Sequence, residues 1–354
     1  MKIILDNIIF SLQKSGGISV VWKELLSRLL RENQISKILS ILEYNNAITN
    51  NIFRKELDIP SHILRKESEK HLVIKRYFSP NVKYSKEDIF HSSYYRYLKG
   101  ARNITTIHDF TYEHYVKGVK QKVHSWQKKL AVLNSEKIIC ISNNTRDDLL
   151  RFIPQVNPEK IEVIYNGVNE GFYPVIKPQT LEGFPFGKEE YLLFVGDRKS
   201  PYKQFNLAIG VARSAKMPLV IVGRPLSQEE KICLASIKYH VLTGVSTEIL
   251  NILYNNAFCL LYPSLYEGFG IPVIEAQRAG CPVIAGANSS ITEVIGKGGI
   301  ALETLDIPNI LTAIQTIGQS SYRNEIIKHG LENSQRFSWN KTYEQTLNVY
   351  KSLM

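Results

Sequence analysis

The chain has few of the features that mark membrane-spanning, secreted or metal-holding proteins. Its longest uninterrupted apolar run, residues 257–262, is far shorter than the roughly 20 residues of a membrane-spanning helix. The amino terminus reaches Asp6 without the apolar stretch of a signal peptide. The 4 cysteines include no CxxC pair and lie in apolar stretches, which predicts reduced, buried thiols and a cytoplasmic location.

Three short phosphate-binding and metal-binding motifs are also missing. The sequence has no Asp-x-Asp that would hold a divalent ion on a diphosphate, and no G-x-x-x-x-G-K-[ST] loop. It has no complete G-x-G-x-x-G either, because Gly268-x-Gly270 lacks the third glycine. Neither a bound metal nor a resident cofactor is therefore expected.

The composition and the hydrophobic pattern predict two α/β domains. A chain of 354 residues, 44% hydrophobic and 22% charged, is long enough for two globular cores. Short β-branched runs alternate with helical patterns, which indicates parallel sheets. The predicted strands are 35–42, 88–92, 103–108, 137–141 and 160–165 in the first half, then 191–195, 219–222, 240–242, 258–262 and 282–285. Residues 174–188, with Pro174, Pro178 and Pro185, are predicted to link the domains.

The net charge of +11 is concentrated in the first half of the chain. Such an excess could attract anionic lipid or nucleic acid, although an ordinary solvated surface explains it equally well. Tyrosines 94, 95 and 97 around Arg96 give slight support to nucleic acid. The basic residues cluster at Arg54, Lys55, Arg65, Lys66, Lys70, Lys75 and Arg76, and at Lys117, Lys120, Lys122, Lys128 and Lys129.

Ligands of open parallel sheets bind beyond the carboxyl ends of the strands, so the loops there are the candidate site. The loop after 258–262 holds Gly268 and Gly270, which allow close approach of a ligand, and Pro272, which suits a helix start. Glu267 and Glu275 flank these glycines and can accept hydrogen bonds from sugar hydroxyls. Glu275 could alternatively serve only the helix dipole.

Three further strand-end loops carry candidate residues. In the loop after 191–195, Gly196 precedes Arg198 and Lys203, a pair of cations that could clamp a pyrophosphate or could simply be surface residues. Gly16-Gly17 precedes an amphipathic helix, and His108-Asp109 ends an apolar strand. Taken alone, the glycine pair is equally typical of a tight connection, and a lone histidine at a strand end is more often structural.

One of these motifs resembles a known family. Glu267 and Glu275, separated by Gly268-Phe269-Gly270-Ile271-Pro272 and two further residues, are similar to the E-x7-E motif of glycosyltransferase family 4, whose members have the GT-B fold. The resemblance extends over nearly the whole chain. It includes residues 141–142, 163–168 and 279–285, and Glu293.

The resemblance implies roles for the residues of the second half. Glu267 would contact the donor sugar and Glu275 the ribose, while the backbones of Phe269, Gly270 and Ile271 would contact the nucleotide. Gly196 would belong to the same nucleotide-binding edge. Arg198 and Lys203 would neutralise the charge that develops on the departing diphosphate.

In the first half, the resemblance places Gly16 and Gly17 against the donor phosphates. It places His108 near the donor sugar, with Asp109 orienting its imidazole ring. Retention of configuration in the family is attributed to substitution on one face of the sugar. The departing phosphate then accepts the acceptor's proton, so no protein nucleophile is required.

The fold expected from the resemblance is α/β, with two Rossmann-like domains whose parallel sheets face a central cleft. Residues 1–173 are predicted to form the acceptor-binding domain and 174–336 the nucleotide-sugar-binding domain. Residues 337–354 are predicted to be a helix that crosses back onto the amino-terminal domain.

The predicted function is a retaining, metal-independent hexosyltransferase. Its partners would be a nucleotide-sugar donor, with a mannose-type GDP-sugar favoured over a UDP-sugar, and a saccharide or lipid-linked saccharide acceptor of bacterial surface polysaccharide, such as lipopolysaccharide O-antigen. The basic domain could hold the enzyme on the inner face of the cell membrane, and no nucleic-acid partner is expected. The alternatives are a non-catalytic saccharide-binding scaffold of the same fold and a sugar-nucleotide epimerase.

Overall fold

The computed structural model describes residues 1–176 and 179–354, and it divides the chain into two compact units. Unit 1 is Met1–Asn166 with Trp339–Met354, and unit 2 is Gly167–Ser338. The first division precedes the predicted boundary at 173/174, and Val168 pairs with Ser338 within unit 2. The segment proposed as a linker, 174–188, has no helix or strand among its described residues, and its Pro178 lies outside them.

Unit 1 is built on a seven-stranded sheet in the order β3-β2-β1-β4-β5-β6-β7. Every neighbouring pair in it is parallel, as the alternation of strands and helices predicts. The strands are β1 (Ile3–Asp6), β2 (Leu39–Tyr44), β3 (Leu64–Glu67), β4 (Ile89–Ser92), β5 (Arg102–Ile107), β6 (Ser135–Cys140) and β7 (Ile161–Val163).

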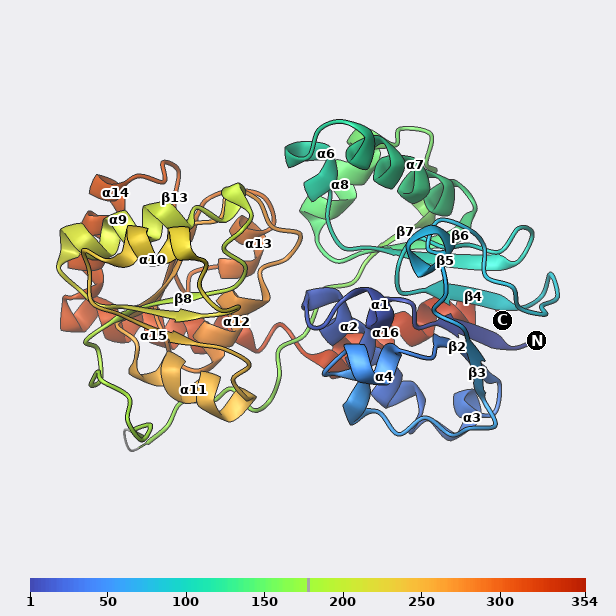
Figure 1. Ribbon diagram of the computed structural model, residues 1–354, viewed down its shortest axis with the longest axis horizontal. Helices are drawn as coiled ribbons and strands as arrows, with labels where there is room; N and C mark the ends of the chain where they lie inside the picture. The colour runs from blue at the N-terminus through green and yellow to red at the C-terminus, as the bar shows by residue number, and fades with distance from the viewer. Residues whose placement is uncertain (177–178) are drawn as a thin grey trace. The chain divides into compact units, whose positions relative to one another are not determined.

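Helices cover both faces of this sheet (Figure 1). One face carries α6, α7 and α8, and the other carries α1, α2 and α16. The helices of unit 1 are α1 (Ile9–Leu12), α2 (Gly17–Leu29), α3 (Asn33–Ser36), α4 (Ala47–Asn50), α5 (Leu72–Lys75), α6 (Thr111–Tyr115), α7 (Val119–Leu133), α8 (Asn143–Phe152) and α16 (Trp339–Ser352), with short 3-10 turns at Arg54–Glu56 and Pro158–Lys160.

The last helix, α16, packs on unit 1, as predicted for the carboxyl-terminal segment. Tyr350 is fully buried and belongs to the same apolar cluster as Leu5 of β1 and Leu26 of α2. Its hydroxyl lies 2.7 Å from Nδ1 of His91 in β4, and Thr342 donates a 2.7 Å hydrogen bond to the carbonyl of Tyr165. The end of the chain therefore completes the core of the first unit.

Among its described residues, unit 2 contains a six-stranded parallel sheet in the order β10-β9-β8-β11-β12-β13. Helices again cover both faces (Figure 1). The strands are β8 (Leu192–Val195), β9 (Leu219–Val222), β10 (Tyr239–Leu242), β11 (Cys259–Tyr262), β12 (Val283–Gly286) and β13 (Ile300–Leu302). The helices are α9 (Phe205–Ala215), α10 (Gln228–Leu234), α11 (Thr247–Asn256), α12 (Ile271–Arg278), α13 (Ile291–Ile295), α14 (Ile307–Ile317) and α15 (Ser320–Ser334), with a 3-10 turn at Pro201–Lys203.

Parts of the predicted surface are buried. Arg96, associated above with nucleic acid, is fully buried, and its Nε donates a 2.7 Å hydrogen bond to Asp6. Arg54 is likewise buried against Glu43. These two cations therefore belong to internal ion pairs and are not available to a polyanion. None of the helices in the described parts of the chain has the length and apolar character needed to cross a membrane.

Candidate active site

The candidate site of unit 2 lies where three neighbouring strands end. β8, β11 and β12 are adjacent and parallel, so the loops that follow them meet at one edge of the sheet. The backbone N–H of Leu265 donates a 2.8 Å hydrogen bond to the carbonyl of Tyr202, which joins the first loop to the second. Glu267 is held by the third loop, because its N–H donates to Ser289 Oγ at 2.9 Å and its carbonyl accepts from Ser290 Oγ at 2.8 Å.

Lys203 and Glu267, predicted on separate loops, form an ion pair in the structure. The Nζ of Lys203 hydrogen-bonds to Oε1 of Glu267, and both side chains are largely buried. Burial alone would lower the pKa of Lys203, but the charge and the hydrogen bond of the Glu267 carboxylate act in the opposite direction, and the pKa is raised above its usual value. A fixed positive charge therefore lies beside a carboxylate at the end of the sheet. This arrangement suits a diphosphate at the lysine and a sugar hydroxyl at the glutamate.

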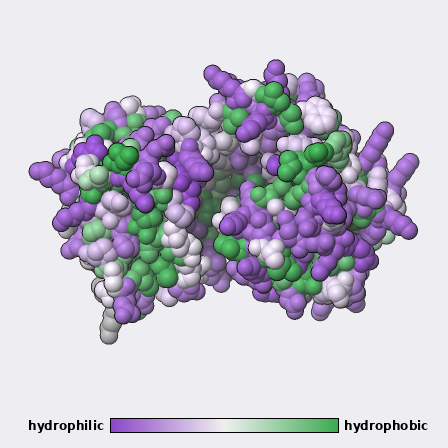
Figure 2. Space-filling model, in the orientation of Figure 1, coloured by the Kyte–Doolittle hydropathy of each residue, from purple (hydrophilic) through white to green (hydrophobic). Residues whose placement is uncertain are grey.

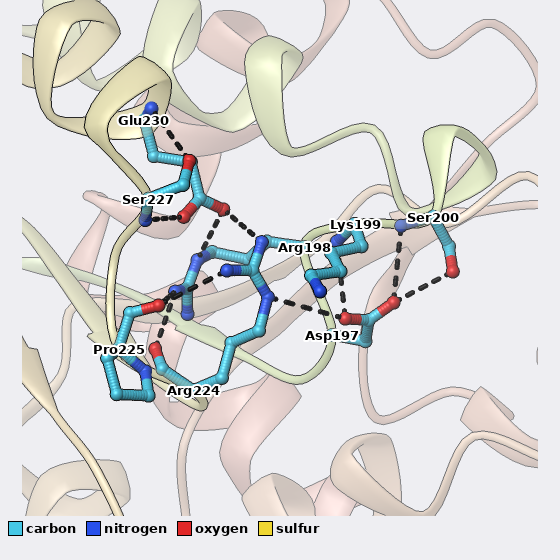
Figure 3. A network of polar contacts seen from close by, with 8 residues as sticks. All are labelled: Asp197, Arg198, Lys199, Ser200, Arg224, Pro225, Ser227 and Glu230. Carbon is cyan, nitrogen blue, oxygen red and sulfur yellow. Dashed lines mark hydrogen bonds and ion pairs between the residues drawn. The ribbon is translucent and has the colours of Figure 1, made fainter.

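Arg198, the other predicted clamp, lies in a different environment (Figure 3). Its side chain is 0% exposed, and its Nε contacts Oε1 of Glu230 at 3.1 Å. Its Nη2 donates to the carbonyls of Arg224 and Pro225 at 2.6 and 3.2 Å. The guanidinium thus ties the loop after β8 to the loop after β9. Its Nη1 is buried, and no residue that the structure describes forms a hydrogen bond with it.

The network around Arg198 includes residues that the sequence analysis did not select. Arg224 Nη2 lies 2.8 Å from Glu230, and its Nε lies 3.9 Å from Asp197 (Figure 3). Glu230 and Ser227 form a capping box at the start of α10. The Ser-x-x-Glu spacing is the one signal that could have drawn attention to Glu230. Its pairing with Arg198 depends on the sheet order and has no local signal.

The glycine-rich segment ends at the amino terminus of α12. Gly270 is its N-cap, with φ of +98°, Ile271 is the first helical residue, and Pro272 follows in the first turn. Phe269 is buried and packs edge-on against Phe337, with ring centroids 5.6 Å apart. The N-cap is a glycine, and no side chain in the described parts of the chain caps α12. Pro272 has no N–H and the N–H of Val273 donates to the carbonyl of Gly270 at 2.9 Å, so of the first three helical residues Ile271 alone offers an N–H. Such a helix start suits an anion.

Replacing Gly270 with alanine should destabilise unit 2 by about 2 kcal/mol, because the backbone at this position has a positive φ that is unfavourable for a residue with a Cβ. The Cβ of the alanine would also lie 2.6 Å from Cδ1 of Ile291. The free energy of unfolding measured by urea denaturation checks this. The matched control is Gly17→Ala, whose Cβ meets nothing within 4 Å. Equal stabilities of the two variants would contradict the prediction.

Glu275, the second glutamate of the motif, is the fifth residue of α12, about one helical turn after Ile271. Tyr254 of α11 donates a 3.1 Å hydrogen bond to its Oε2. Burial raises the pKa of Glu275 to about 7, although the hydrogen bond from Tyr254 acts in the opposite direction. The carboxylate is thus held by a specific partner, which goes beyond a simple interaction with the helix dipole.

This raised pKa predicts a pH-dependent donor affinity. The resemblance implies that Glu275 contacts the ribose, and an ionised carboxylate can accept two hydrogen bonds from ribose hydroxyls, whereas the protonated acid has weaker acceptor capacity. Since the pKa is about 7, the ionised fraction increases as the pH rises through 7, and the donor KM should fall over that range. Measuring KM between about pH 5.5 and 8.5 tests this. The Glu275→Gln variant cannot ionise, so a KM that falls equally in this variant would contradict the assignment.

The predicted residues of unit 1 are arranged as follows. Gly16 is the N-cap and Gly17 the first residue of the 13-residue helix α2. His108 follows β5 and is nearly buried. Burial lowers the pKa of His108 to about 4, so its imidazole is neutral at pH 7.

Asp109 does not orient the His108 ring in this structure. Its Oδ1 accepts a 2.9 Å hydrogen bond from the N–H of Thr111, and its carbonyl accepts from Lys128 Nζ at 2.9 Å. Among residues 1–176 and 179–354, no hydrogen bond joins its carboxylate to the imidazole of His108. The resemblance to the family had implied that orienting role. The carboxylate of Asp109 instead accepts the hydrogen bond of the Thr111 N–H in the turn that begins α6.

His108 lines a mostly apolar cavity at the carboxyl ends of the unit 1 strands, together with Trp22, His91 and Thr106. His91 is fully engaged there, between the hydroxyls of Tyr350 and Thr106 at 2.7 and 2.8 Å. Asn166 also lines this cavity, and its buried Oδ1 has no hydrogen-bond partner within residues 1–176 and 179–354. Tyr343 lines the cavity as well, and its buried hydroxyl likewise has no partner among the described residues, so two unpartnered polar atoms lie in the same cavity as the neutral histidine.

Two family models match the sequence. The model described as Glycosyltransferase Family 4 matches residues 15–172, and the one described as Glycosyl transferases group 1 matches 177–317. O-antigen chain mannosyltransferase RfbU of Salmonella typhimurium is 31% identical over 254 residues, which cover 68% of this chain and 69% of that protein. The chain belongs to glycosyltransferase family 4. It is accordingly an enzyme that transfers sugars.

Other comparisons agree with membership of family 4. O-antigen chain mannosyltransferase B of Escherichia coli is 27% identical over 291 residues, covering 76% of this chain and 75% of that protein. The fold is similar to that of sucrose-phosphate synthase from Thermosynechococcus elongatus, with a TM-score of 0.75 and 17% identity over 100% of this chain and 99% of that one. The two Rossmann-like units therefore form a GT-B glycosyltransferase, as the motifs predict.

Proposed function

We propose that this glycosyltransferase moves a mannose-type hexose from a GDP-sugar to a saccharide or lipid-linked saccharide of bacterial surface polysaccharide. The named activities of the O-antigen mannosyltransferases from Escherichia coli and Salmonella typhimurium support the sugar and the pathway class. The observation that carries the proposal is the Lys203–Glu267 pair beside the uncapped start of α12. It provides a cation, a carboxylate and backbone donors for one sugar diphosphate.

In the proposed assignment, unit 2 binds the donor. The Nζ of Lys203 and the N–H of Ile271, the first residue of α12, contact the diphosphate, while Glu267 and Glu275 contact the sugar and the ribose. Gly196, Gly268, Phe269 and Gly270 complete the nucleotide-binding edge through their backbones. Arg198 is proposed to offer its Nη1, which has no hydrogen-bond partner among the described residues; because the side chain is 0% exposed, this contact requires the side chain to move.

Unit 1 is proposed to bind the acceptor and to contribute Gly16 and Gly17 to the donor phosphates. A neutral His108 can hold a sugar hydroxyl without adding charge near a developing oxocarbenium ion. The basic excess of this unit supports a cytoplasmic enzyme attached to an anionic membrane surface. No nucleic-acid partner is proposed.

The proposed reaction proceeds on one face of the donor sugar, with retention and without a metal. The bond from C1 to the diphosphate oxygen breaks, and the acceptor hydroxyl oxygen forms a new bond to C1. The acceptor's proton passes to the departing phosphate. Lys203 stabilises the charge of that phosphate, and no protein nucleophile takes part.

Acceptor-dependent turnover tests this proposal. The purified protein is incubated in EDTA with a panel of GDP-, UDP- and ADP-sugars and lipid-linked acceptors, while nucleotide release and product mass are followed. We expect release that depends on the acceptor, favours GDP-mannose and disappears in Glu267→Ala. Release without acceptor would indicate the epimerase alternative. Binding of saccharide without turnover of any nucleotide sugar would indicate the scaffold.

A further inference from the structure

Helix α7 exposes three apolar side chains and buries three polar ones, alongside its buried Ala131 and Val132. Val119, Trp126 and Leu133 are 76%, 53% and 41% exposed. On the other side of the helix, His124, Gln127 and Lys128 are buried. Exposed apolar patches and buried polar groups are the informative departures from normal burial. The outer face of α7 therefore requires an explanation beyond folding.

The buried polar side chains of α7 are accounted for inside unit 1. Lys128 Nζ lies 2.8 Å from Oε2 of Glu113 and 4.1 Å from the centre of the Phe110 ring. His124 stacks on Tyr112, with ring centroids 3.9 Å apart, and Gln127 donates to the carbonyl of Arg76 at 2.5 Å. These contacts determine which side of α7 faces inward. The apolar side chains at 119, 126 and 133 are consequently left on the outside.

The exposed residues form a ridge with lysines along it. Positions seven residues apart drift by only about 20° around a helix, so Val119, Trp126 and Leu133 share one line. Lys122 and Lys129 are exposed beside this line. The whole helix, residues 119–133, contains no acidic residue. We name this surface, made of Val119, Lys122, Trp126, Lys129 and Leu133, the α7 ridge.

We propose that the α7 ridge docks the enzyme on anionic lipid headgroups, with Trp126 inserted at the interface. Apolar side chains flanked by lysines suit a helix that lies in the membrane plane, because the lysine stems reach back to the headgroups. Figure 2 shows hydrophobic groups among protruding hydrophilic ones over the region of α6 and α7. The inference deepens the proposed function, since a lipid-linked acceptor resides at such a surface.

The lysines and apolar side chains of the α7 ridge favour an anionic lipid surface over a second copy of this chain or nucleic acid. A second copy meeting the same ridge would bring Lys122 and Lys129 against identical lysines, with no acidic residue in α7 to offset them. Nucleic acid would satisfy the lysines but would leave Val119 and Leu133 against a polar backbone. An anionic bilayer satisfies both kinds of side chain.

The fluorescence of Trp126 can report this docking. Of its 3 tryptophans, Trp22 and Trp339 are 3% and 5% exposed, so Trp126 alone has an emission that can respond to lipid. The protein is titrated with phosphatidylcholine vesicles holding 0 or about 40% phosphatidylglycerol, about the range in which surface charge dominates binding. We expect cosedimentation and a blue shift of Trp126 only with the anionic vesicles.

Two charge-matched variants locate the surface. Lys122→Glu/Lys129→Glu should bind anionic vesicles at least about 20-fold more weakly than the unmodified protein. Lys37→Glu/Lys55→Glu changes the same number of exposed charges elsewhere on unit 1 and should bind within about two-fold of it. Trp126→Ser should abolish the blue shift and weaken binding. These outcomes together support the α7 ridge as the docking surface.

Several results would overturn the proposal. Absence of binding to anionic vesicles would do so, as would equal loss of binding in both lysine variants. Sedimentation showing a dimer that only Lys122→Glu/Lys129→Glu changes would assign the ridge to a second copy. Vesicle binding is measured without any sugar, and nucleotide release with a water-soluble acceptor is measured without vesicles. Failure of the docking proposal is therefore distinguishable from failure of the proposed transfer reaction.

Discussion

Replacing Lys203 with methionine is expected to lower kcat about 100- to 1,000-fold, the usual loss when a preorganised charge facing a developing anion is removed. The side chain is largely buried, so water cannot easily replace the ammonium group. Methionine preserves the length and apolar packing of the lysine stem. Initial rates at saturating donor and acceptor, measured with product mass as the readout, give the change in kcat.

The control for this substitution is Lys199→Met. Lys199 is on the same loop but exposed, and its hydrogen bond to Asp197 is made by the backbone N–H. We expect kcat of this variant to stay within about threefold of the unmodified enzyme. A Lys203→Met enzyme that retained full kcat would show that the lysine serves only to neutralise Glu267. The double variant with Glu267→Gln then separates the two effects, because the residues form one pair.

Most strands could be predicted because they are buried on both faces. β8, β9 and β11 are short apolar runs bounded by turn residues, and the structure places them within one residue of the predicted limits. The edge strands β3 and β13 were missed, since half-exposed edge positions do not need an apolar run.

Another strand was predicted too long, and the reason is local. Ile35 was taken as the start of a strand over 35–42, but it lies in the short helix α3 and points into the core there. A single buried isoleucine satisfies either pattern, so periodicity could not separate them. The strand itself begins at Leu39.

The candidate residues could be found from the sequence, but not their partners. The E-x7-E spacing identifies Glu267, whereas its pairing with Lys203, 64 residues away, follows from β8 and β11 being neighbours in the sheet. Lys128 shows the same limit, because in the sequence it is one of several lysines predicted on the surface. Its burial depends on Glu113 and on the aromatic rings around it.

Arg198 is expected to stabilise unit 2 in addition to any contact with the donor, and Glu230→Gln tests this role. Removing one partner of a buried ion pair leaves the other charge unpaired, so the free energy of unfolding should fall by about 3 kcal/mol. Glutamine still fits the capping box with Ser227, so the start of α10 is retained. Urea denaturation of the full chain measures the loss.

The control is Glu229→Gln, an exposed neighbour in the same helical turn, which should change stability by less than about 0.5 kcal/mol. Burial alone would raise the pKa of Glu230, but hydrogen bonds from Ser227 and Arg198 lower it below the usual 4.5. A carboxylate with a lowered pKa contributes its stability above the usual value and loses it as the pH falls through the folded-state pKa.

The stability difference between the unmodified enzyme and Glu230→Gln should therefore be complete at neutral pH and shrink in acid. If Glu230→Gln instead unfolds at the same urea concentration as the unmodified enzyme while kcat falls, Arg198 acts on the donor and its buried contacts do not hold the two loops together. The converse result, a less stable protein with kcat retained, assigns Arg198 to the fold. Lys203 would then be the only one of the two predicted cations acting on the diphosphate.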